Sequence, residues 1–255
     1  MSFNAPTPPK LALSAAGLPP GADPRGAITR TSGLGLRAIA LDATDPAIRP
    51  RNLSRSARRD LSATLRRSEL DLAGIDLFLP PEHLTDPTHS QRAIDAISQA
   101  CELSSELAAL VGGRSRNLIS ITLPESLDAG TREHLSSIAQ RWGTMIADHM
   151  PADLNADSGA LLNLGLDPAT DLIAGVDPIT RAHGVSVLRL SDCNQLGRCP
   201  VGAQGSRLKL DEYAAACMIG DHAWVTLDVR GLHHPIDAAR DAIDAWDAVS
   251  NPFSM

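Results

Sequence analysis

The chain has 255 residues, of which 43% are hydrophobic and 21% charged, and its net charge is −7 at pH 7. This composition is close to that of globular proteins, so we expect a sizeable buried core rather than extended disorder. The apolar runs are too short to cross a bilayer, and the acidic balance disfavours a protein that binds nucleic acid through a general basic field.

The cysteines and the first residues indicate the cellular compartment. The opening residues, MSFNAPTPPK, lack the basic and hydrophobic segments of a secretory signal. The four cysteines include no CxxC pair. We therefore expect free thiols and a cytoplasmic location.

Short apolar runs alternate with longer amphipathic segments along the whole chain. Near-continuous apolar runs of this length are typical of parallel strands that are buried on both faces. We expect eight strands, at Lys10–Ala16, Arg37–Ala43, Ile75–Pro80, Leu118–Pro124, Thr144–His149, Ala160–Asp167, Val185–Asp192 and Ala223–Val229.

Most segments between these strands have helical spacing of their apolar residues. Ser54 is expected to cap the second helix. The stretch Met150–Ser158 is too short and polar for a full helix, so we expect a loop there. The helices are predicted at Asp23–Gly33, Ser54–Ala73, Ser90–Val111, Thr131–Trp142, Thr170–His183, Leu210–Ile219 and Pro235–Val249.

Eight strand–helix alternations without a dividing linker favour one closed (β/α)8 TIM barrel over residues 10–250. Residues 1–9 are expected to form a loosely packed tail, and residues 251–255 a second one. The main alternative is a doubly wound open sheet. That fold favours a GxGxxG motif after an early strand, and here only Gly33-Leu34-Gly35 precedes the second strand.

Ionisable residues stand where several predicted strands end. The carboxyl ends of all strands in a (β/α)8 barrel meet at one face, where catalytic residues lie. We expect convergence there, although each acid could instead cap a helix or open a turn. Only one of two neighbouring strand residues can point inward. The strand-end residues are Asp42, Asp148 or His149, Asp167, Arg189 with Asp192, and Asp228 with Arg230.

The segment after the second strand is basic, with Arg49-Pro50-Arg51 followed by Arg55, Arg58 and Arg59. One interpretation is a solvated helix face. The other places Arg49 and Arg51 over the barrel mouth, where a guanidinium group can hold a phosphate or carboxylate.

Nearly the whole chain, and most strongly its C-terminal half, resembles the xylose isomerase-like TIM barrels, a superfamily of sugar isomerases, sugar epimerases and endonuclease-IV-type enzymes. LGLDPATDLIAGVDP (Leu164–Pro178) is similar to the family's sixth strand and its following turn, and VSVLRLSD (Val185–Asp192) is similar to its seventh strand. VGAQGSRLKLDEY (Val201–Tyr213) resembles its glycine-rich loop, and AWVTLDVRG (Ala223–Gly231) its last strand.

This resemblance implies a divalent ion held by Glu, Asp, His and Glu from strands five to eight, with two carboxylates that also transfer a proton. The matching positions here hold Asp148 or His149, Asp167, Arg189 and Asp228. Arg has no lone pair for a cation. Three outcomes stay open. Mn, Mg or Zn is bound by Asp167, Asp192 and His149 together with Asp228; Arg189 replaces the ion in polarising a substrate oxygen; or the site is not catalytic.

The leading hypothesis is an isomerase or epimerase of a small sugar or sugar derivative that transfers a proton next to a carbonyl. Asp228 and Asp148 are the expected acid–base pair. Substrate contacts are expected from Arg189, Arg230, Arg49 and Arg51.

The alternative is a catalytically degenerate barrel that binds a ligand or partner. A DNA-repair nuclease of the endonuclease-IV type would require more histidine and acidic ligands and a basic groove. The expected partner is a small carbohydrate, with neither nucleic acid nor membrane, and a homodimer is compatible with the sequence.

Overall fold

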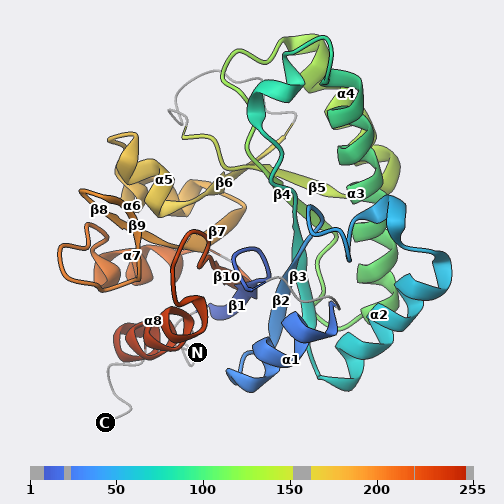
Figure 1. Ribbon diagram of the computed structural model, residues 1–255. Coiled ribbons are helices and arrows are strands. Elements are labelled where there is room, and N and C mark those ends of the chain that lie inside the picture. Colours follow the sequence, from blue (N-terminus) through green and yellow to red (C-terminus); the bar gives the residue numbers. More distant parts are fainter. Residues whose placement is uncertain (1–8, 20–23, 152–161, 221, 251–255) are drawn as a thin grey trace, which may run out of the picture.

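Eight parallel strands close into a barrel in the order β1-β10-β7-β6-β5-β4-β3-β2 (Figure 1). The computed structural model describes residues 9–19, 24–151, 162–220 and 222–250. Because β1 pairs with both β2 and β10, no sheet edge is left, and the single (β/α)8 barrel is confirmed over an open doubly wound sheet. The barrel strands are β1 (Lys10–Ser14), β2 (Ala38–Asp42), β3 (Asp71–Asp76), β4 (Leu118–Ile121), β5 (Met145–Asp148), β6 (Asn163–Leu166), β7 (Val187–Leu190) and β10 (Trp224–Leu227).

Helices cover the outside of the barrel (Figure 1). A short antiparallel hairpin, β8 (Asp192–Asn194) and β9 (Gly197–Cys199), follows β7. No helix among the described residues is both long and apolar enough to cross a membrane. The helices are α1 (Arg25–Gly33), α2 (Arg55–Arg67), α3 (Ser90–Val111), α4 (Ala129–Trp142), α5 (Pro168–Ile173), α6 (Pro178–Arg181), α7 (Leu210–Cys217) and α8 (Pro235–Ser250).

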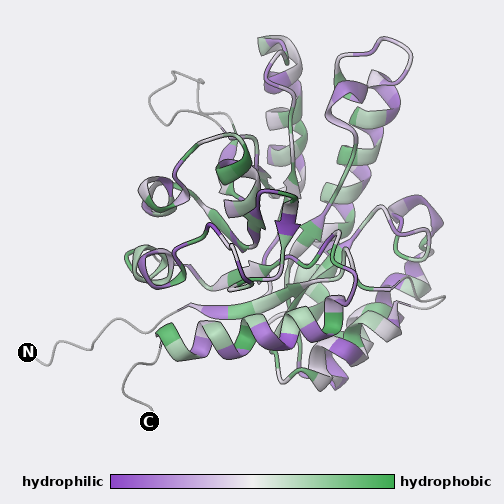
Figure 2. Cartoon of the chain, turned by 60° about the vertical axis from the view of Figure 1, so that its left-hand side comes forward, coloured by the Kyte–Doolittle hydropathy of each residue, from purple (hydrophilic) through white to green (hydrophobic). Residues whose placement is uncertain are grey.

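Side chains alternate between the inside of the barrel and the surrounding helices, as the pleat of a strand requires. On β1, Leu11 and Leu13 pack in the core shared with α7 and α8, whereas Ala12 packs in a separate small cluster of alanines with Trp224. Figure 2 shows the result, with mainly hydrophobic strands and helices that carry both hydrophobic and hydrophilic residues. The small residues inside the barrel leave space for longer polar side chains near its carboxyl end.

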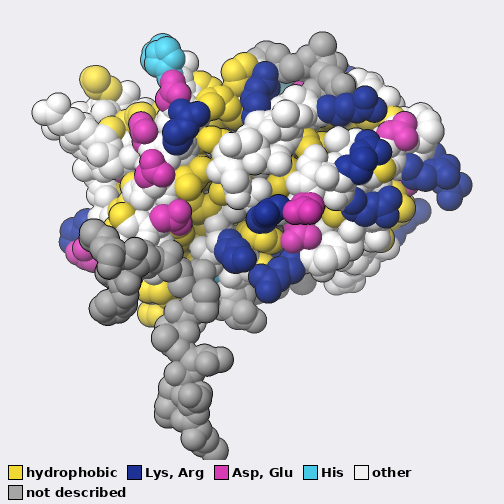
Figure 3. All heavy atoms as spheres, turned by 90° about the horizontal axis from the view of Figure 1, so that it is seen from below, with side chains coloured by type: hydrophobic (Ala, Val, Ile, Leu, Met, Phe, Trp, Pro, Cys, Tyr) yellow, Lys and Arg dark blue, Asp and Glu magenta, His cyan; other side chains and the backbone are white. Residues whose placement is uncertain are grey.

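The helix α3 begins and ends at the predicted residues, and Ser54 caps α2 by accepting a hydrogen bond from the Ala57 N–H. Exposed arginines on α2, among them Arg59 and Arg66, agree with the solvated helix face. The view from below shows Arg and Lys side chains over much of one side of the molecule, with Asp and Glu among them (Figure 3).

The third strand was placed too late in the sequence analysis. We predicted Ile75–Pro80, but β3 is Asp71–Asp76, and α2 ends at Arg67 instead of Ala73. The helix stops in a turn where Glu69 has a φ of 53° and the Leu70 N–H donates to the Leu65 carbonyl. Ala73 and Gly74 are weak β formers, so the sequence concealed the start of the strand.

The predicted helix Thr170–His183 is also wrong, because two short helices, α5 and α6, take its place. Gly175 between them has a φ of 80°, and Pro178 starts α6, so the helix cannot continue. The start of the predicted sixth strand, most of the predicted loop Met150–Ser158 and both expected tails lie largely outside the described residues.

A buried ion pair joins these two helices and generates a prediction about stability. Nη1 of Arg181 lies 2.6 Å and 2.5 Å from the two carboxylate oxygens of Asp171, and both side chains are buried. Replacing Arg181 with Met leaves the Asp171 charge without its partner, so the free energy of unfolding should fall by about 3 kcal/mol. Urea denaturation measures this change.

The matched control is the double variant Asp171→Asn with Arg181→Met, which removes the unpaired charge as well. It should be clearly more stable than Arg181→Met alone. Equal stability of Arg181→Met and the unaltered protein would show that the pair does not hold α5 and α6 together.

Candidate active site

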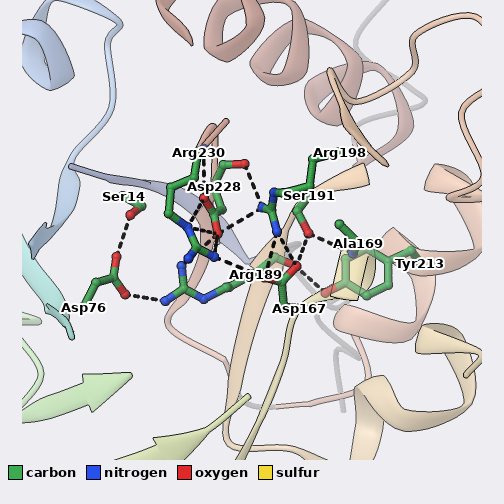
Figure 4. Close-up of polar contacts among 10 residues, drawn as sticks. All are labelled: Ser14, Asp76, Asp167, Ala169, Arg189, Ser191, Arg198, Tyr213, Asp228 and Arg230. Carbon is green, nitrogen blue, oxygen red and sulfur yellow. Dashed lines mark hydrogen bonds and ion pairs between the residues drawn. The ribbon is translucent and has the colours of Figure 1, made fainter. Parts of the chain in front are cut away.

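Three arginines and three aspartates meet at the carboxyl end of the barrel (Figure 4). Most follow or end barrel strands, whereas Arg198 is carried by the hairpin strand β9. Each of them forms an ion pair with at least one other member of the group. We call this group the arginine–aspartate cluster: Asp76, Asp167, Arg189, Arg198, Asp228 and Arg230.

Arg189 lies in the middle of the cluster, and its side chain is only 2% exposed. Its Nη2 pairs with Asp76, and its Nη1 lies 3.2 Å from Oδ2 of Asp228. The other oxygen of Asp76 accepts a hydrogen bond from Ser14 Oγ at 2.5 Å. Arg189 on β7 therefore crosses the interior to β3, which lies opposite β7 in the barrel order, and also contacts the acid that follows the neighbouring strand β10.

Arg198 and Arg230 bridge the two acids that follow β6 and β10. Arg198 lies 3.0 Å from Asp167 through Nη1 and 3.0 Å from Asp228 through Nη2. Nη2 of Arg230 lies 2.5 Å from Asp228 and 3.4 Å from Asp167. The guanidinium carbon of Arg230 also lies 3.6 Å from the centre of the Phe78 ring, in cation–π contact.

The arginines keep both central acids ionised. Burial alone would raise the pKa of Asp228, but Arg189, Arg198 and Arg230 outweigh it and hold that pKa well below its usual range. The pKa of Asp167 is lowered in the same way, against burial, with Arg198 as the largest favourable contribution. Neither carboxylate is therefore disposed to accept a proton near neutral pH.

His149 faces the cluster, which decides between the two neighbouring candidates at the end of β5. Its two ring nitrogens have no hydrogen-bond partner among the described residues, although the side chain is buried. Burial first, and then the charge of Arg189, lowers its pKa to about 3, so the imidazole is neutral at pH 7. The ring lies against Gly165, where an added Cβ would approach Cε1 of His149 to 2.6 Å.

Asp148 and Asp192 do not join the cluster. Asp148 accepts hydrogen bonds from the backbone N–H groups of Leu123 and Met150, both at 3.0 Å, and burial raises its pKa. Asp192 accepts from Ser206 Oγ at 2.5 Å and from the Leu208 N–H at 3.0 Å, so it holds the glycine-rich loop in place.

The remaining sequence candidates lie on the other side of the barrel end. Asp42 accepts from the N–H and the hydroxyl of Thr44, as a residue that opens a turn does. Arg49 and Arg51 line a cavity beside α3, and within the described part of the chain neither forms a hydrogen bond or ion pair with the cluster.

The sequence analysis missed Asp76, Phe78 and Arg198. The misplaced third strand put Asp76 near its beginning instead of at its carboxyl end, where an acid would have been a candidate. Arg198 lies on a hairpin that was not predicted. The polar run Asn194–Gly197, flanked by Cys193 and Cys199, was the signal available for it.

The cluster does not fit a divalent metal ion. Among the residues that the structure describes, no group of three or more His, Cys, Asp or Glu side chains is arranged to hold one. Asp167 and Asp228 are the only acids of the expected ligand set near His149, and their oxygens already contact guanidinium groups. A hard cation needs a surplus of negative oxygen ligands, and three arginine charges cancel that surplus.

Solved structures share this fold. IolI protein with a zinc atom has a TM-score of 0.69 at 16% identity, covering 96% of this chain and 100% of that one. D-psicose 3-epimerase, solved in the presence of D-fructose, has a TM-score of 0.68 at 12% identity, and the match covers 94% of this chain and 99% of that one. A xylose isomerase-like TIM barrel protein from Mycobacterium smegmatis in complex with magnesium has a TM-score of 0.63 at 11% identity, and the match covers 96% of this chain and 97% of that one. No family model and no curated protein matches the sequence. The chain thus shares the closed (β/α)8 fold of these proteins, as the strand–helix alternation predicted.

The buried imidazole generates a prediction about pH. His149 should stay neutral well below the ordinary histidine pKa of about 6.5. As the pH falls, the unfolded chain protonates this histidine near pH 6.5, before the folded chain does. The stability that neutral His149 contributes is therefore present above pH 6.5 and is lost as the pH falls toward about 3. NMR of histidine-labelled protein, assigned with His149→Gln, measures the titration.

A midpoint for His149 near the ordinary histidine pKa of about 6.5 would contradict the buried, uncharged imidazole.

Proposed function

We propose that this chain is an isomerase or epimerase of a small sugar or sugar derivative, in which guanidinium groups supply the positive charge at the reacting oxygen. The observation that carries the proposal is His149, a neutral imidazole with both ring nitrogens unpartnered, buried beside three arginines at the catalytic end of a barrel. A buried polar group without a partner is costly, so it points to a ligand that completes it.

Proton transfer next to a carbonyl needs a group that takes the proton and a positive environment for the enediolate oxygen. A neutral imidazole can accept a proton at one nitrogen while the other donates a hydrogen bond. Negative charge developing on the substrate favours the protonated ring, which opposes the effect of the arginines on its pKa. His149 is therefore assigned the proton transfer.

The arginines are assigned different roles by their exposure. Arg198 and Arg230 have side chains that are 21% and 29% exposed, so they can be reached from solvent and would contact a substrate oxygen. Arg189 is buried and positions Asp76 and Asp228. Phe78, beneath Arg230, offers an apolar surface to the carbon chain of a sugar.

The acid–base pair expected from the sequence receives other roles in this proposal. The carboxylate of Asp228 orients guanidinium groups, and both of its oxygens already accept hydrogen bonds from Arg230. Asp148 holds the backbone after β4 and β5. The metal site expected from Asp167, Asp192 and His149 has no part in the mechanism, because Asp192 has its own loop partners.

The substrate class is supported by the fold neighbours, which include L-ribulose 3-epimerase and D-psicose 3-epimerase with D-tagatose. Both are named for epimerisation at the carbon next to a ketose carbonyl. At 12% and 15% identity they share the fold, and the sugar class enters here as part of the proposal.

A second candidate is a barrel that binds a sugar without turnover. It is favoured by the pairing of Asp76, Asp167 and Asp228 with arginines, which leaves none of the three acids of the cluster free to act as a base. The two functions differ in one observable, the exchange of the hydrogen next to the carbonyl.

The test is proton exchange in D2O, followed by NMR over a panel of ketoses and ketose phosphates. The unaltered protein should introduce deuterium next to the carbonyl of at least one member. His149→Gln should slow this exchange at least about a hundredfold, since a general acid–base group contributes about 10² to 10⁴ in rate. Gly165→Ala should also slow it, because the new methyl group displaces the ring.

His134→Gln is the matched control, because it removes an exposed histidine on α4. It should leave the exchange rate unchanged. Exchange that persists in His149→Gln would remove the assignment of the imidazole, and a sugar that binds without any exchange would establish the second candidate.

A further inference from the structure

A cavity of about 470 Å³ lies beside the barrel, separate from the arginine–aspartate cluster. We call it the β2–β3 pocket, since the segments after β2 and β3 form two of its walls and α3 forms the third. Its volume falls in the range of sites for small ligands. Its lining includes Thr44, Arg49, Arg51, Leu77, Leu79 and Arg92.

The alternation of side chains after β3 separates the pocket from the cluster. Asp76 pairs with Arg189, and the ring of Phe78 contacts Arg230, so these two residues face the cluster. Leu77 and Leu79 line the pocket instead. The segment therefore forms a wall with one site on each side.

The arginines of the β2–β3 pocket lack the carboxylate partners that those of the cluster have. Arg51 and Arg92 make no hydrogen bond or ion pair with any residue that the structure describes. Within the same described part of the chain, Arg49 donates to the Thr44 carbonyl at 3.0 Å and pairs with no acid. Asp95 is the one acidic side chain among the lining residues, and it accepts a hydrogen bond from Gln91.

The other walls suit the carbon skeleton of a small molecule. Leu77 and Leu79 are apolar, and the rings of His83 and His89 stack with their centres 4.6 Å apart. Nδ1 of His89 lies 2.5 Å from Asp86, which fixes that ring. The pocket thus combines an aromatic and apolar wall with the exposed cationic side chains of Arg51 and Arg92.

We propose that the β2–β3 pocket binds the phosphate group of a phosphorylated small molecule. Three guanidinium groups and one carboxylate give the lining a net charge of about two, which matches a phosphate monoester dianion. Guanidinium groups bind phosphate oxygens through paired, charge-assisted hydrogen bonds. This inference goes beyond the proposed reaction, and it stands even if the barrel does not turn over a sugar.

Calorimetry with inorganic phosphate, fructose 6-phosphate and fructose tests the proposal. The two phosphate-bearing probes should bind saturably in competition with each other. Arg51→Gln and Arg92→Gln should each weaken this binding about tenfold or more, as the loss of hydrogen bonds to a charged group does. Arg59→Gln on α2, which lies outside the pocket lining, is the matched control and should bind like the unaltered protein.

Equal affinity in Arg92→Gln and Arg59→Gln, or no binding of either phosphate probe, would overturn the proposal. These results need no turnover, so they are independent of the exchange experiment on His149.

Two sources of the phosphate group are distinguished by the exchange assay on Arg92→Gln. A raised KM for fructose 6-phosphate, with fructose unaffected, identifies the phosphate of the substrate itself. Unchanged exchange of both sugars, with phosphate binding lost, identifies a separate ligand. Either result supports the pocket.

Discussion

Ionised carboxylates that are withdrawn from water require opposite charges beside them, and this requirement organises the carboxyl end of the barrel. Asp76, Asp167 and Asp228 are all buried. Arg189, Arg198 and Arg230 supply the positive charge from two strand ends and a hairpin. A bound divalent cation could satisfy such acids in another barrel. Here guanidinium groups, which are part of the chain, do so, and the site's charge is fixed by covalent structure.

Small side chains make this arrangement possible. Ala12, Ala38 and Ala40 pack inside the barrel, and Gly165 leaves room for the ring of His149. The long side chain of Arg189 can then cross the interior to Asp76. The same strand pleat sends Asp148 toward the helices and Leu77 into the β2–β3 pocket. One end of the fold therefore carries a neutralised cluster and, across one segment of chain, a pocket whose arginines have no acid partners among the described residues.

Apolar patterning predicted the barrel because strand and helix periods repeat over most of the chain. It located α3 and most strands, but it failed at Asp71–Asp76, where Ala73 and Gly74 weaken the β signal. That single error hid Asp76, since only its place at a strand end marks it as a candidate. The pattern also predicted correctly that Asp167 and Asp228 lie close together, because the carboxyl ends of the strands meet at one face of the barrel. It could not assign partners: whether an acid faces a guanidinium group or a backbone N–H depends on contacts between distant segments.

We propose that arginines balance the acids in place of a divalent ion, with Arg198 and Arg230 bridging Asp167 and Asp228. A crystal soaked in Mn²⁺, with data collected at the manganese absorption edge, tests this most directly. The account predicts no anomalous peak between Asp167 and Asp228, with Arg189 still joined to Asp76 and Asp228. An ordered manganese at that position, with the arginines displaced outward, would contradict it.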